Sequence, residues 1–312
     1  MNEWRPNSDA KLAKRRADML ARVRRYFEAR SVLEVDTPSL SHTTVTDPNI
    51  ASIGVSGDRF LSTSPEFAMK RLLAAGYPDI FSICRVFRDE ERGRLHLPEF
   101  TMVEWYRHGF GLDDIVRDTL ALIAFVASRP ELAHDVPVID YADVIQQFAG
   151  VDPLTASVDE LAHAAEADAE LAASLGDRRD DWLDLLLATR VAPSLPSDSL
   201  TVIRHYPISQ AALARCNPDN PAVADRFEVF IGNVELANGF VELTDAEEQA
   251  ERMQTDIDER RRRGQPTPDP DEHFLDALRA GLPECAGVAL GFERLHMFVE
   301  ECDDIRDVVT FS

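Results

Sequence analysis

The sequence predicts an α+β fold in which a mainly antiparallel sheet is flanked by helices. Segments with strand-like patterns mostly follow one another along the chain, as Ile80–Phe87 and residues 100–106 do. Helical patterns are grouped around these strands instead of alternating with them. Hydrophobic residues make up 45% of the 312 residues, which is enough for a substantial core and excludes a wholly disordered chain.

The charge of the chain is strongly negative and excludes some kinds of protein. With 33 basic and 56 acidic residues the formal net charge is −23. This charge argues against a protein that binds nucleic acid over its whole surface, but it is compatible with a local basic cleft. No apolar segment approaches the roughly 20 residues that cross a membrane. The 4 cysteines form no C-x-x-C pair, so we expect reduced thiols in a cytoplasmic protein.

The N-terminal part alternates helices and short strands. Residues 9–29 have apolar side chains along one helical face, with Ser8 or Asp9 as the cap. Residues 32–38 alternate as a strand does, and Pro38 ends that pattern. These residues therefore predict a helix followed by a short strand.

A second helix at residues 64–76 follows a strand at residues 60–63. Ser64 is suited to its cap and Pro65 to its first position. Two apolar strands come next, and the charged loop between them, residues 88–99, is too long for a mere turn. The pattern predicts a long hairpin.

Residues 112–195 differ from what precedes them, because they are rich in Ala, Leu and Asp with helical spacing. We interpret them as a helical insertion. Strand patterns return at residues 200–205, 227–231 and 234–236, and a turn at residues 232–233 joins the last two.

The C-terminal part predicts a charged helix at residues 245–263 and another at 274–280. A glycine-punctuated strand at residues 287–291 then opens into a last helix at 292–301. No internal repeat or low-complexity linker divides the chain, so we expect a single domain over residues 1–312.

Three groups of polar residues on these elements could carry chemistry. The first is in the hairpin, where Arg88 and Glu90 begin the loop and Phe100 follows it. The planar guanidinium of an arginine binds phosphate through paired hydrogen bonds, and an aromatic ring offers a face to a flat base. Taken alone, this hairpin is also compatible with ordinary surface ion pairs.

The second group is Glu228, Glu235 and Glu242, which recur every seven residues. Because the chain turns between the first two, their carboxylates can come together to bind a hard cation with phosphate, or a cationic substrate. Three unrelated surface acids are the alternative, and the apolar neighbours on both strands weigh against it.

The third group is Gly291 and Arg294 at the junction of the last strand and helix. A glycine lets a ligand approach the backbone, and the start of a helix favours anions.

In this order, the proline-ended strand, F-R-x-E with its later phenylalanine, and G-x-E-R resemble the three signature motifs of the class II aminoacyl-tRNA synthetases. Residues 63–66, 98–102 and 235–240 resemble the lysyl-tRNA synthetase branch more closely. The resemblance runs from about residue 12 to the C-terminus, so it implies the catalytic core of that fold, with a helical insertion and no N-terminal anticodon-binding domain.

A catalytic core alone, with Ala289 where the tRNA enzymes usually have glycine, resembles the elongation factor P–(R)-β-lysine ligase family. That family resembles a truncated lysyl-tRNA synthetase. The resemblance implies that the chain activates (R)-β-lysine with ATP as an aminoacyl-adenylate, releases pyrophosphate, and transfers the amino acid to a lysine of elongation factor P. The methyl group of Ala289 would narrow the amino-acid pocket and favour a β-amino acid.

The resemblance also implies roles for individual residues. The catalytic residues are Arg88 and Arg294. ATP is bound by Arg88, Asp89, Glu90, His96, Phe100, Glu235, Leu236, Gly291 and Arg294. The amino acid is bound by Ser64, Pro65, Glu66, Glu104, Tyr106, Asn238, Glu242 and Ala289. Glu228 and Glu235 hold Mg²⁺. Leu97 stands where the family usually has a polar asparagine, which removes one side-chain contact to ATP.

The expected partners follow from the same resemblance: elongation factor P, a second copy of the chain in a homodimer, and neither tRNA nor membrane. Three alternatives remain open at this point. They are a lysyl-tRNA synthetase-like enzyme that needs a separate anticodon-binding partner, an amidoligase like the short asparagine synthetase, and a non-catalytic paralogue that binds an amino acid. The sequence leaves open whether α-lysine or β-lysine is the substrate.

Overall fold

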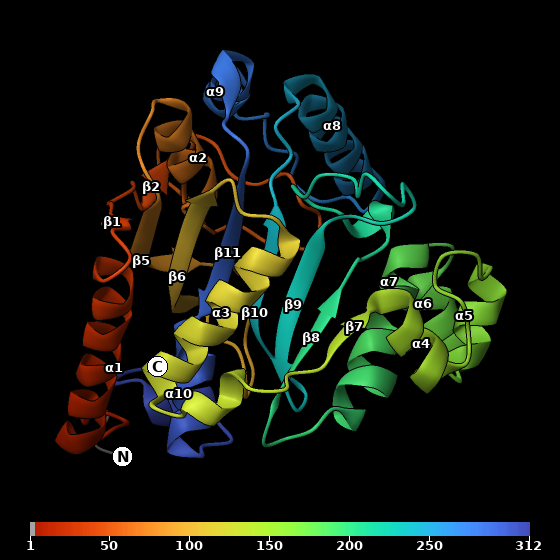
Figure 1. Cartoon of the computed structure of the whole chain (residues 1–312). Helices are drawn as coiled ribbons and strands as arrows, with labels where there is room; N and C mark the ends of the chain where they lie inside the picture. The colour runs from red at the N-terminus through yellow and green to blue at the C-terminus, as the bar shows by residue number, and fades with distance from the viewer. Residues whose placement is uncertain (1–3) are drawn as a thin grey trace.

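The structure is a computed structural model that describes residues 4–312. An eight-stranded sheet lies at its centre, in the order β1-β5-β6-β11-β10-β9-β8-β7 (Figure 1). Only the two edge pairs, β1 with β5 and β7 with β8, are parallel, so the expected mainly antiparallel sheet is confirmed. The strands are β1 (Leu33–Glu34), β5 (Ile80–Phe87), β6 (Glu99–His108), β7 (Val138–Asp140), β8 (Leu200–Arg204), β9 (Arg226–Ile231), β10 (Val234–Val241) and β11 (Cys285–Gly291).

Helices cover both faces of this sheet, and the alternation of side chains along β6 explains the two layers. Val103 and Trp105 join the core beneath α1 (Ala10–Glu28), α3 (Leu112–Ala127) and α10 (Phe292–Glu300). Tyr106 points to the opposite face, where it packs with α2 (Glu66–Ala74), α8 (Ala246–Arg262) and α9 (Glu272–Gly281). Glu104, two residues before Tyr106, therefore also points to this second face.

The predicted hairpins form as expected. β5 and β6 pair over eight residues, and the backbone N–H of Arg88 donates to the Pro98 carbonyl at 2.9 Å, which closes the base of the long loop. Between β9 and β10 the chain turns at Gly232, whose φ of 54° is the left-handed conformation that glycine adopts readily. Both hairpins bring predicted site residues toward the middle of the sheet.

The proline-ended strand is shorter than expected. β1 spans two residues, and pairing ends where Val35 donates its N–H to the Phe81 carbonyl at 2.8 Å. A small second sheet follows it, in which only the strand near residues 60–63 was expected. It consists of β2 (Leu40–Ser41), β4 (Arg59–Leu61) and β3 (Gly54–Val55).

The expected insertion over residues 112–195 divides into two parts. α3 packs on the sheet as part of the main core, whereas a separate apolar cluster begins at Tyr141 and includes Trp182 and Leu186. A pattern rich in Ala and Leu is the same for a helix on a sheet and for one in a separate unit, so only packing distinguishes the two. The separate unit contains α4 (Tyr141–Ala149), α5 (Val158–Ala164), α6 (Ala169–Leu175) and α7 (Arg179–Leu186), and we call it the helical unit.

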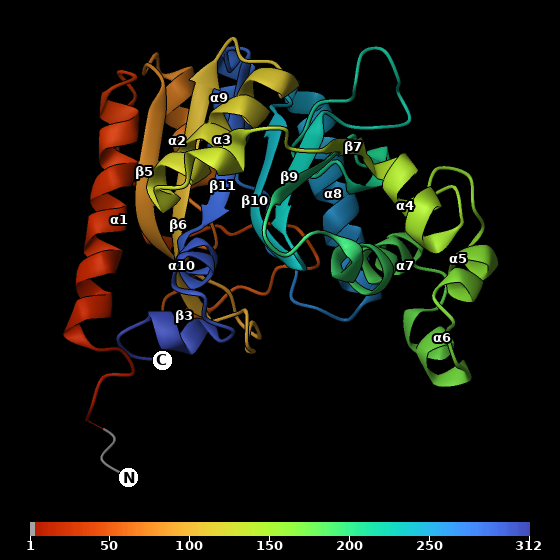
Figure 2. The same cartoon turned by 60° about the horizontal axis from the view of Figure 1, so that its bottom comes forward.

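The helical unit lies beyond β7, at the end of the sheet opposite α1, in both views (Figures 1 and 2). A π-helical turn at Leu187–Val191 ends it. Single 3-10 turns lie at Pro130–Ala133, Ala192–Ser194, Ile208–Gln210 and Ile305–Val308. Within residues 4–312, no helix is both long and apolar enough to cross a membrane.

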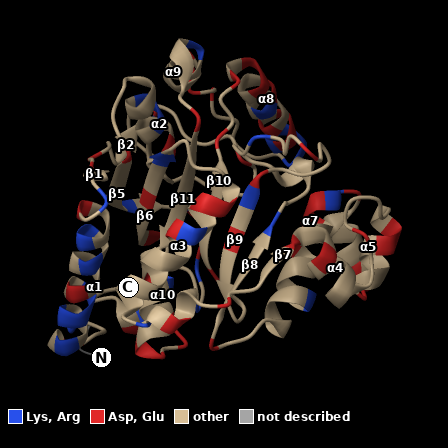
Figure 3. Cartoon of the chain, viewed as in Figure 1, with Lys and Arg blue, Asp and Glu red and all other residues tan. Residues whose placement is uncertain are grey.

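Lys and Arg residues recur along α1 (Figure 3), and the side chains of two of them bind α10. Arg15 donates from Nε to Glu300 at 2.7 Å, and Arg16 donates from Nη2 to Glu293 at 2.8 Å. Glu293 is buried, and its other carboxylate oxygen accepts from the Thr101 N–H of β6 at 2.8 Å. The glutamate of the G-x-E-R motif therefore joins three elements of the core.

We expect Glu293→Ala to lower the free energy of unfolding by about 3 kcal/mol, because it leaves Arg16 and the Thr101 N–H without their acceptor in a buried setting. Urea denaturation followed by circular dichroism measures this loss. Glu131→Ala, which removes an exposed carboxylate, is the matched control. Equal stability of the two variants would contradict the anchoring role of Glu293.

Candidate active site

A cavity of about 900 Å³ opens on the face of the sheet that α2 and α8 cover. β6, β10 and β11 form its floor, the start of α2 forms one wall, and the helical unit contributes to the opposite rim. Several predicted site residues line it: Ser64, Glu66, Arg88, Glu104, Tyr106, Asn238, Glu242 and Ala289. The structure thus brings Arg88 and most of the predicted amino-acid-binding residues into one space.

Two buried carboxylates form the acidic end of the cavity. Glu104 accepts hydrogen bonds from the Tyr106 hydroxyl at 2.7 Å and from Ser64 Oγ at 2.9 Å. Burial raises the pKa of Glu104 to about 7 and that of Glu242 to about 8. Both groups would gain from an ammonium ion placed beside them, since a nearby positive charge favours the ionised form.

Glu66 begins α2 and completes this end of the cavity. Its backbone N–H donates to Ser64 Oγ at 3.1 Å, and Ser64 Oγ donates to Glu104. Ser64 was expected to cap this helix and Pro65 to be its first residue, but α2 begins one residue later, at Glu66, so Ser64 precedes the cap. Pro65 lies at the N-cap position and is absent from the lining of the cavity. The Glu66 side chain therefore lines the cavity because α2 begins at this residue.

Lys70 is a residue of this site that sequence reasoning missed. It lies one helical turn after Glu66, and its Nζ is 2.6 Å from Glu66 Oε1 and 2.5 Å from Glu242 Oε2. Burial lowers the pKa of Lys70, but the carboxylates of Glu242 and Glu66 outweigh that effect and raise it overall. The i, i+4 spacing with Glu66 is the signal that could have found it.

Gly287 was also missed, and its backbone forms part of the same pocket. A Cβ at this position would collide with the Tyr106 ring and with Glu242 Oε1. Ala289, on the same strand, lies opposite Glu104 on β6 and Asn238 on β10. The methyl group of Ala289 therefore lies between the two strands that carry predicted substrate-binding residues.

Arg88 is free to bind a ligand. Its guanidinium is 5.3 Å from the centre of the Phe100 ring, and Nη1 is 3.3 Å from Glu91. Its Nε is buried and has no hydrogen-bond partner among residues 4–312. A buried donor without an acceptor is costly, so this N–H is suited to an incoming oxygen. Asp89 and Glu90 are exposed on the following loop.

Arg294 lies apart from the larger cavity and lines a second one of about 450 Å³. It donates from Nη1 to the Glu235 carbonyl at 2.8 Å, and its Nη2 is 2.7 Å from His96 Nε2. Burial and the charge of Arg294 lower the pKa of His96, so the neutral ring accepts this hydrogen bond. Arg88 thus lines the larger cavity and Arg294 the smaller one, and the charges of both arginines help to lower the pKa of His96.

The strand–helix junction at Gly291 is open. A Cβ there would make only ordinary contacts, with Arg294 Cδ at 3.8 Å and the Leu236 carbonyl at 4.0 Å, so packing within the chain does not require a glycine. Leu236, predicted to bind ATP, is 1% exposed and belongs to the buried core.

Glu228 and Glu235 lie on the paired strands β9 and β10, and their donor set fits Mg²⁺. Glu228 accepts from the Tyr206 hydroxyl at 2.7 Å and from Arg226 at 2.6 Å. Burial raises the pKa of Glu228 to about 7, and the charge of Glu235 adds to that rise. Among the described residues no group of three or more His, Cys, Asp or Glu could hold a metal ion. Two carboxylates suit Mg²⁺ when phosphates supply further oxygens.

Glu242 stands apart from this pair although it continues the seven-residue spacing. It follows the end of β10 and contacts Lys70 rather than joining a cation site with Glu228 and Glu235.

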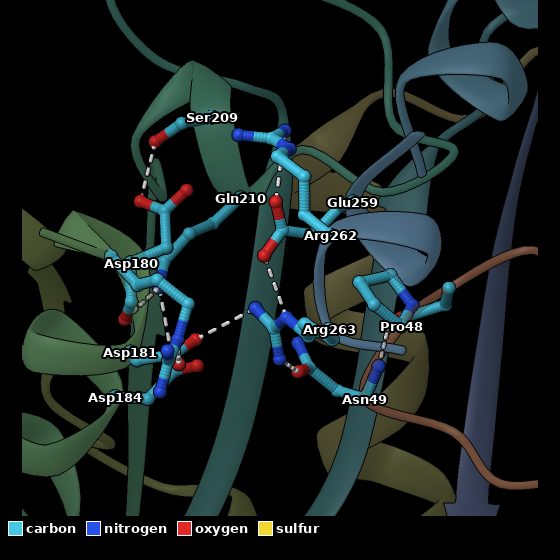
Figure 4. Close-up of polar contacts among 12 residues, drawn as sticks. Pro48, Asn49, Asp180, Asp181, Asp184, Ser209, Gln210, Glu259, Arg262 and Arg263 are labelled. Atoms are coloured by element: carbon cyan, nitrogen blue, oxygen red, sulfur yellow. Dashed lines mark hydrogen bonds and ion pairs between the residues drawn. The ribbon is translucent and has the colours of Figure 1, made fainter. Parts of the chain in front are cut away.

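The rim of the cavity joins the helical unit to the core (Figure 4). Asp180 accepts from Ser209 Oγ at 2.7 Å, and Asp184 accepts from Gln210 at 2.7 Å. Arg263, just after α8, donates to Asp181 at 3.1 Å. These contacts hold α7 against the opening of the cavity.

Comparison with known proteins identifies the family. The model of the tRNA synthetases class II (D, K and N) matches residues 2–312. The chain belongs to this family. Relatives named elongation factor P–(R)-β-lysine ligase include one from Haemophilus influenzae, 40% identical over 100% of this chain and 98% of its own length. The relative from Pseudoalteromonas translucida is 42% identical over 100% of this chain and 98% of its own length. The one from Salmonella arizonae is 40% identical over 99% of this chain and 97% of its own length. The chain belongs with these ligases, as the resemblance of its motifs predicted.

Proposed function

We propose that this class II synthetase is an ATP-dependent, AMP-forming ligase. It activates (R)-β-lysine as an aminoacyl-adenylate and transfers it to a lysine side chain of elongation factor P. The names of its relatives support the acceptor and the amino acid. The observation that carries the proposal is the acidic end of the cavity, where Glu66, Glu104 and Glu242 face the same space as Arg88.

The acidic end suits an amino acid with two ammonium groups. Glu66 lies at the start of α2 and would bind one amine, whereas Glu104 and Glu242 would bind the other. Asn238, opposite Ala289, would contact the carboxylate. A neutral or acidic side chain would leave buried carboxylates uncompensated, which disfavours aspartate and thus an asparagine synthetase-like reaction.

In the first step a carboxylate oxygen of the amino acid attacks the α-phosphorus of ATP, and the bond to pyrophosphate breaks. The carboxylate is already ionised, so this step needs no general base. The unpaired Nε–H of Arg88 would donate to the α-phosphate, where negative charge increases. Phe100 would stack on one face of the adenine, and Arg294 would cover the other face and reach the γ-phosphate. Neutral His96, which accepts a hydrogen bond from Arg294, would also contact the phosphates.

Glu228 and Glu235 would hold Mg²⁺ together with the phosphates. When bound, the ion supplies neutralising charge to the departing pyrophosphate. Asp89 and Glu90 would position the nucleotide through the hairpin loop, and Leu236 and Gly291 would contact it through the backbone.

In the second step the neutral amine of the acceptor lysine attacks the carbonyl carbon of the adenylate. The carbon–oxygen bond to AMP breaks, and the proton of the amine passes to the released phosphate. The product is an amide on the side chain of elongation factor P. An acceptor of this kind places the reaction in the cytoplasm.

We also propose that residues 1–312 form one catalytic domain and that two copies associate through the region of Pro38. The continuous sheet from β1 to β7 supports the single domain. Light scattering tests the association, and a mass of one chain at micromolar concentration would contradict it.

The function is tested by ATP–pyrophosphate exchange with (R)-β-lysine, α-lysine and aspartate, followed by transfer to elongation factor P or to tRNA. We expect exchange with (R)-β-lysine in preference to the others, and transfer to the protein. Exchange with none of them would contradict the proposal of an enzyme and favour an amino-acid-binding paralogue. Efficient charging of tRNA would favour the lysyl-tRNA synthetase alternative.

A further inference from the structure

Lys70 differs from the other lysines of this chain. The chain has three lysines, and Lys11 and Lys14 are exposed on α1, whereas Lys70 is 1% exposed. A lysine is almost never fully buried unless its charge is compensated. Its place inside an active-site wall therefore needs an explanation from the groups around it.

The surroundings of Lys70 compensate its charge from two elements. Its Nζ lies between Glu66 of α2 and Glu242, which follows β10, at 2.6 and 2.5 Å. The aromatic rings of Phe240 and Phe274 are 5.3 and 5.7 Å from the same nitrogen. Lys70 is thus held between two carboxylates that line the cavity, one at the start of α2 and the other just after β10.

Other titratable groups face this cluster from β6 and β11. Glu104 and Tyr106 lie on β6 and are hydrogen-bonded to each other, and Cys285 lies on β11. Burial raises the pKa of Cys285 above 9, so this thiol and the Tyr106 hydroxyl stay neutral near pH 7. The charges that matter are therefore those of three carboxylates and one ammonium.

These charges leave a definite balance. When Glu66, Glu104 and Glu242 are ionised, Lys70 cancels one of their three negative charges, and two remain. A lysine-like amino acid carries two ammonium groups. The net charge of these four groups therefore matches the two ammonium groups of the substrate only because Lys70 is present.

We propose that Lys70 determines the specificity for a diamino acid as a positioning residue, because it holds Glu66 and Glu242 in place and leaves the three glutamates at the acidic end of the cavity with two uncompensated negative charges. This inference rests on the proposed function. Lys70 does not touch the reacting atoms, so it acts through the two carboxylates.

The inference predicts how binding depends on pH. The substrate amines bind ionised carboxylates, so kcat/KM rises with pH until these groups have lost their protons. The Lys70 charge lowers the pKa of both Glu104 and Glu242, although burial keeps them near 7 and 8. Without Lys70 both pKa values increase further, and the acidic limb of the profile moves to higher pH.

The experiment compares Lys70→Met and Lys70→Arg in ATP–pyrophosphate exchange with (R)-β-lysine between about pH 6 and pH 9.5. For Lys70→Met we expect a KM raised on the order of 10²-fold at pH 7, a smaller change in kcat, and an acidic limb about one unit higher. Lys70→Arg keeps the charge and should restore the limb. Lys14→Met, at an exposed lysine, is the matched control.

If Lys70→Met does not fold, as circular dichroism will show, the double variant Lys70→Met with Glu66→Gln restores the balance of two negative charges. It should have the acidic limb of the unchanged protein even though its KM stays high. Calorimetry of (R)-β-lysine binding in buffers of different ionisation enthalpy measures how many protons are released on binding, independently of catalysis. The single variant should release more protons at pH 7 than the unchanged protein.

Two results would overturn the inference alone: an unchanged KM in Lys70→Met, or a uniform loss of kcat/KM at every pH with the limb in place, which indicates packing only. The inference would also be overturned if the acidic limb of the kcat/KM profile is displaced as far in the double variant as in Lys70→Met. Absence of exchange by the unchanged protein with any of the amino acids would instead overturn the proposed function and this inference with it.

Discussion

Arg88→Met should lower the rate of ATP–pyrophosphate exchange by about 10³-fold, with a smaller change in the KM for (R)-β-lysine. The guanidinium lies beside Phe100, and its buried Nε–H has no acceptor within residues 4–312. A donor held in this way and directed at the α-phosphate stabilises charge that grows only as the reaction proceeds, so its loss should reduce kcat more than binding.

The measurement is exchange at saturating ATP, with Arg117→Met as control. Arg117 is exposed on α3, where it pairs with Asp114. Arg88 contributes to the fold an ion pair with Glu91 and a contact between its guanidinium and the Phe100 ring, so Arg88→Met should unfold at nearly the same urea concentration as the unchanged protein. Exchange within about tenfold of the unchanged rate would contradict the catalytic role.

Glu235→Gln should reduce exchange by at least about 10³-fold, because it removes one of the two carboxylates that we propose hold Mg²⁺ with the phosphates. The fold should tolerate the change. Arg294 donates to the Glu235 backbone carbonyl at 2.8 Å, and its Nη1 is 3.6 Å from the Glu235 carboxylate, which is 39% exposed. The glutamine keeps both the shape and that carbonyl, so the loss should reflect the missing charge.

The dependence of the residual rate on Mg²⁺ distinguishes this cause from others. Glu235→Gln should need a higher Mg²⁺ concentration for its half-maximal rate than the unchanged protein does. Glu170→Gln, at an exposed carboxylate of α6, should behave as the unchanged protein. An unaltered Mg²⁺ dependence together with near-normal exchange would show that Glu235 is not a metal ligand.

Much of the candidate site could be predicted because its residues lie on regular elements. The β5–β6 hairpin follows from two apolar strands around a charged loop, so the positions of Arg88 and Phe100 on either side of that loop were predictable. The turn at Gly232 likewise brings Glu228 and Glu235 onto paired strands. In these cases local pattern determines which residues become neighbours.

Other features depended on packing between elements that are far apart in the chain. α3 and the helices of the helical unit have the same composition, yet α3 joins the main core and the others form a separate cluster. β1 pairs with only Ile80 and Phe81 of β5, although β5 itself continues to Phe87. Neither property is encoded within the segment itself.

By itself, the sequence determined the α+β class, the order of the main elements and the family, because periodicity and motif spacing are local properties of the chain. Only the tertiary structure decided that Glu242 leaves its seven-residue partners and meets Lys70 and Glu66. Lys70 and Glu242 are far apart in sequence, and they come together only when the fold places α2 beside the end of β10. The charge of the pocket is therefore a property of that packing, since a carboxylate's partners are set by the elements around it rather than by its neighbours in the chain.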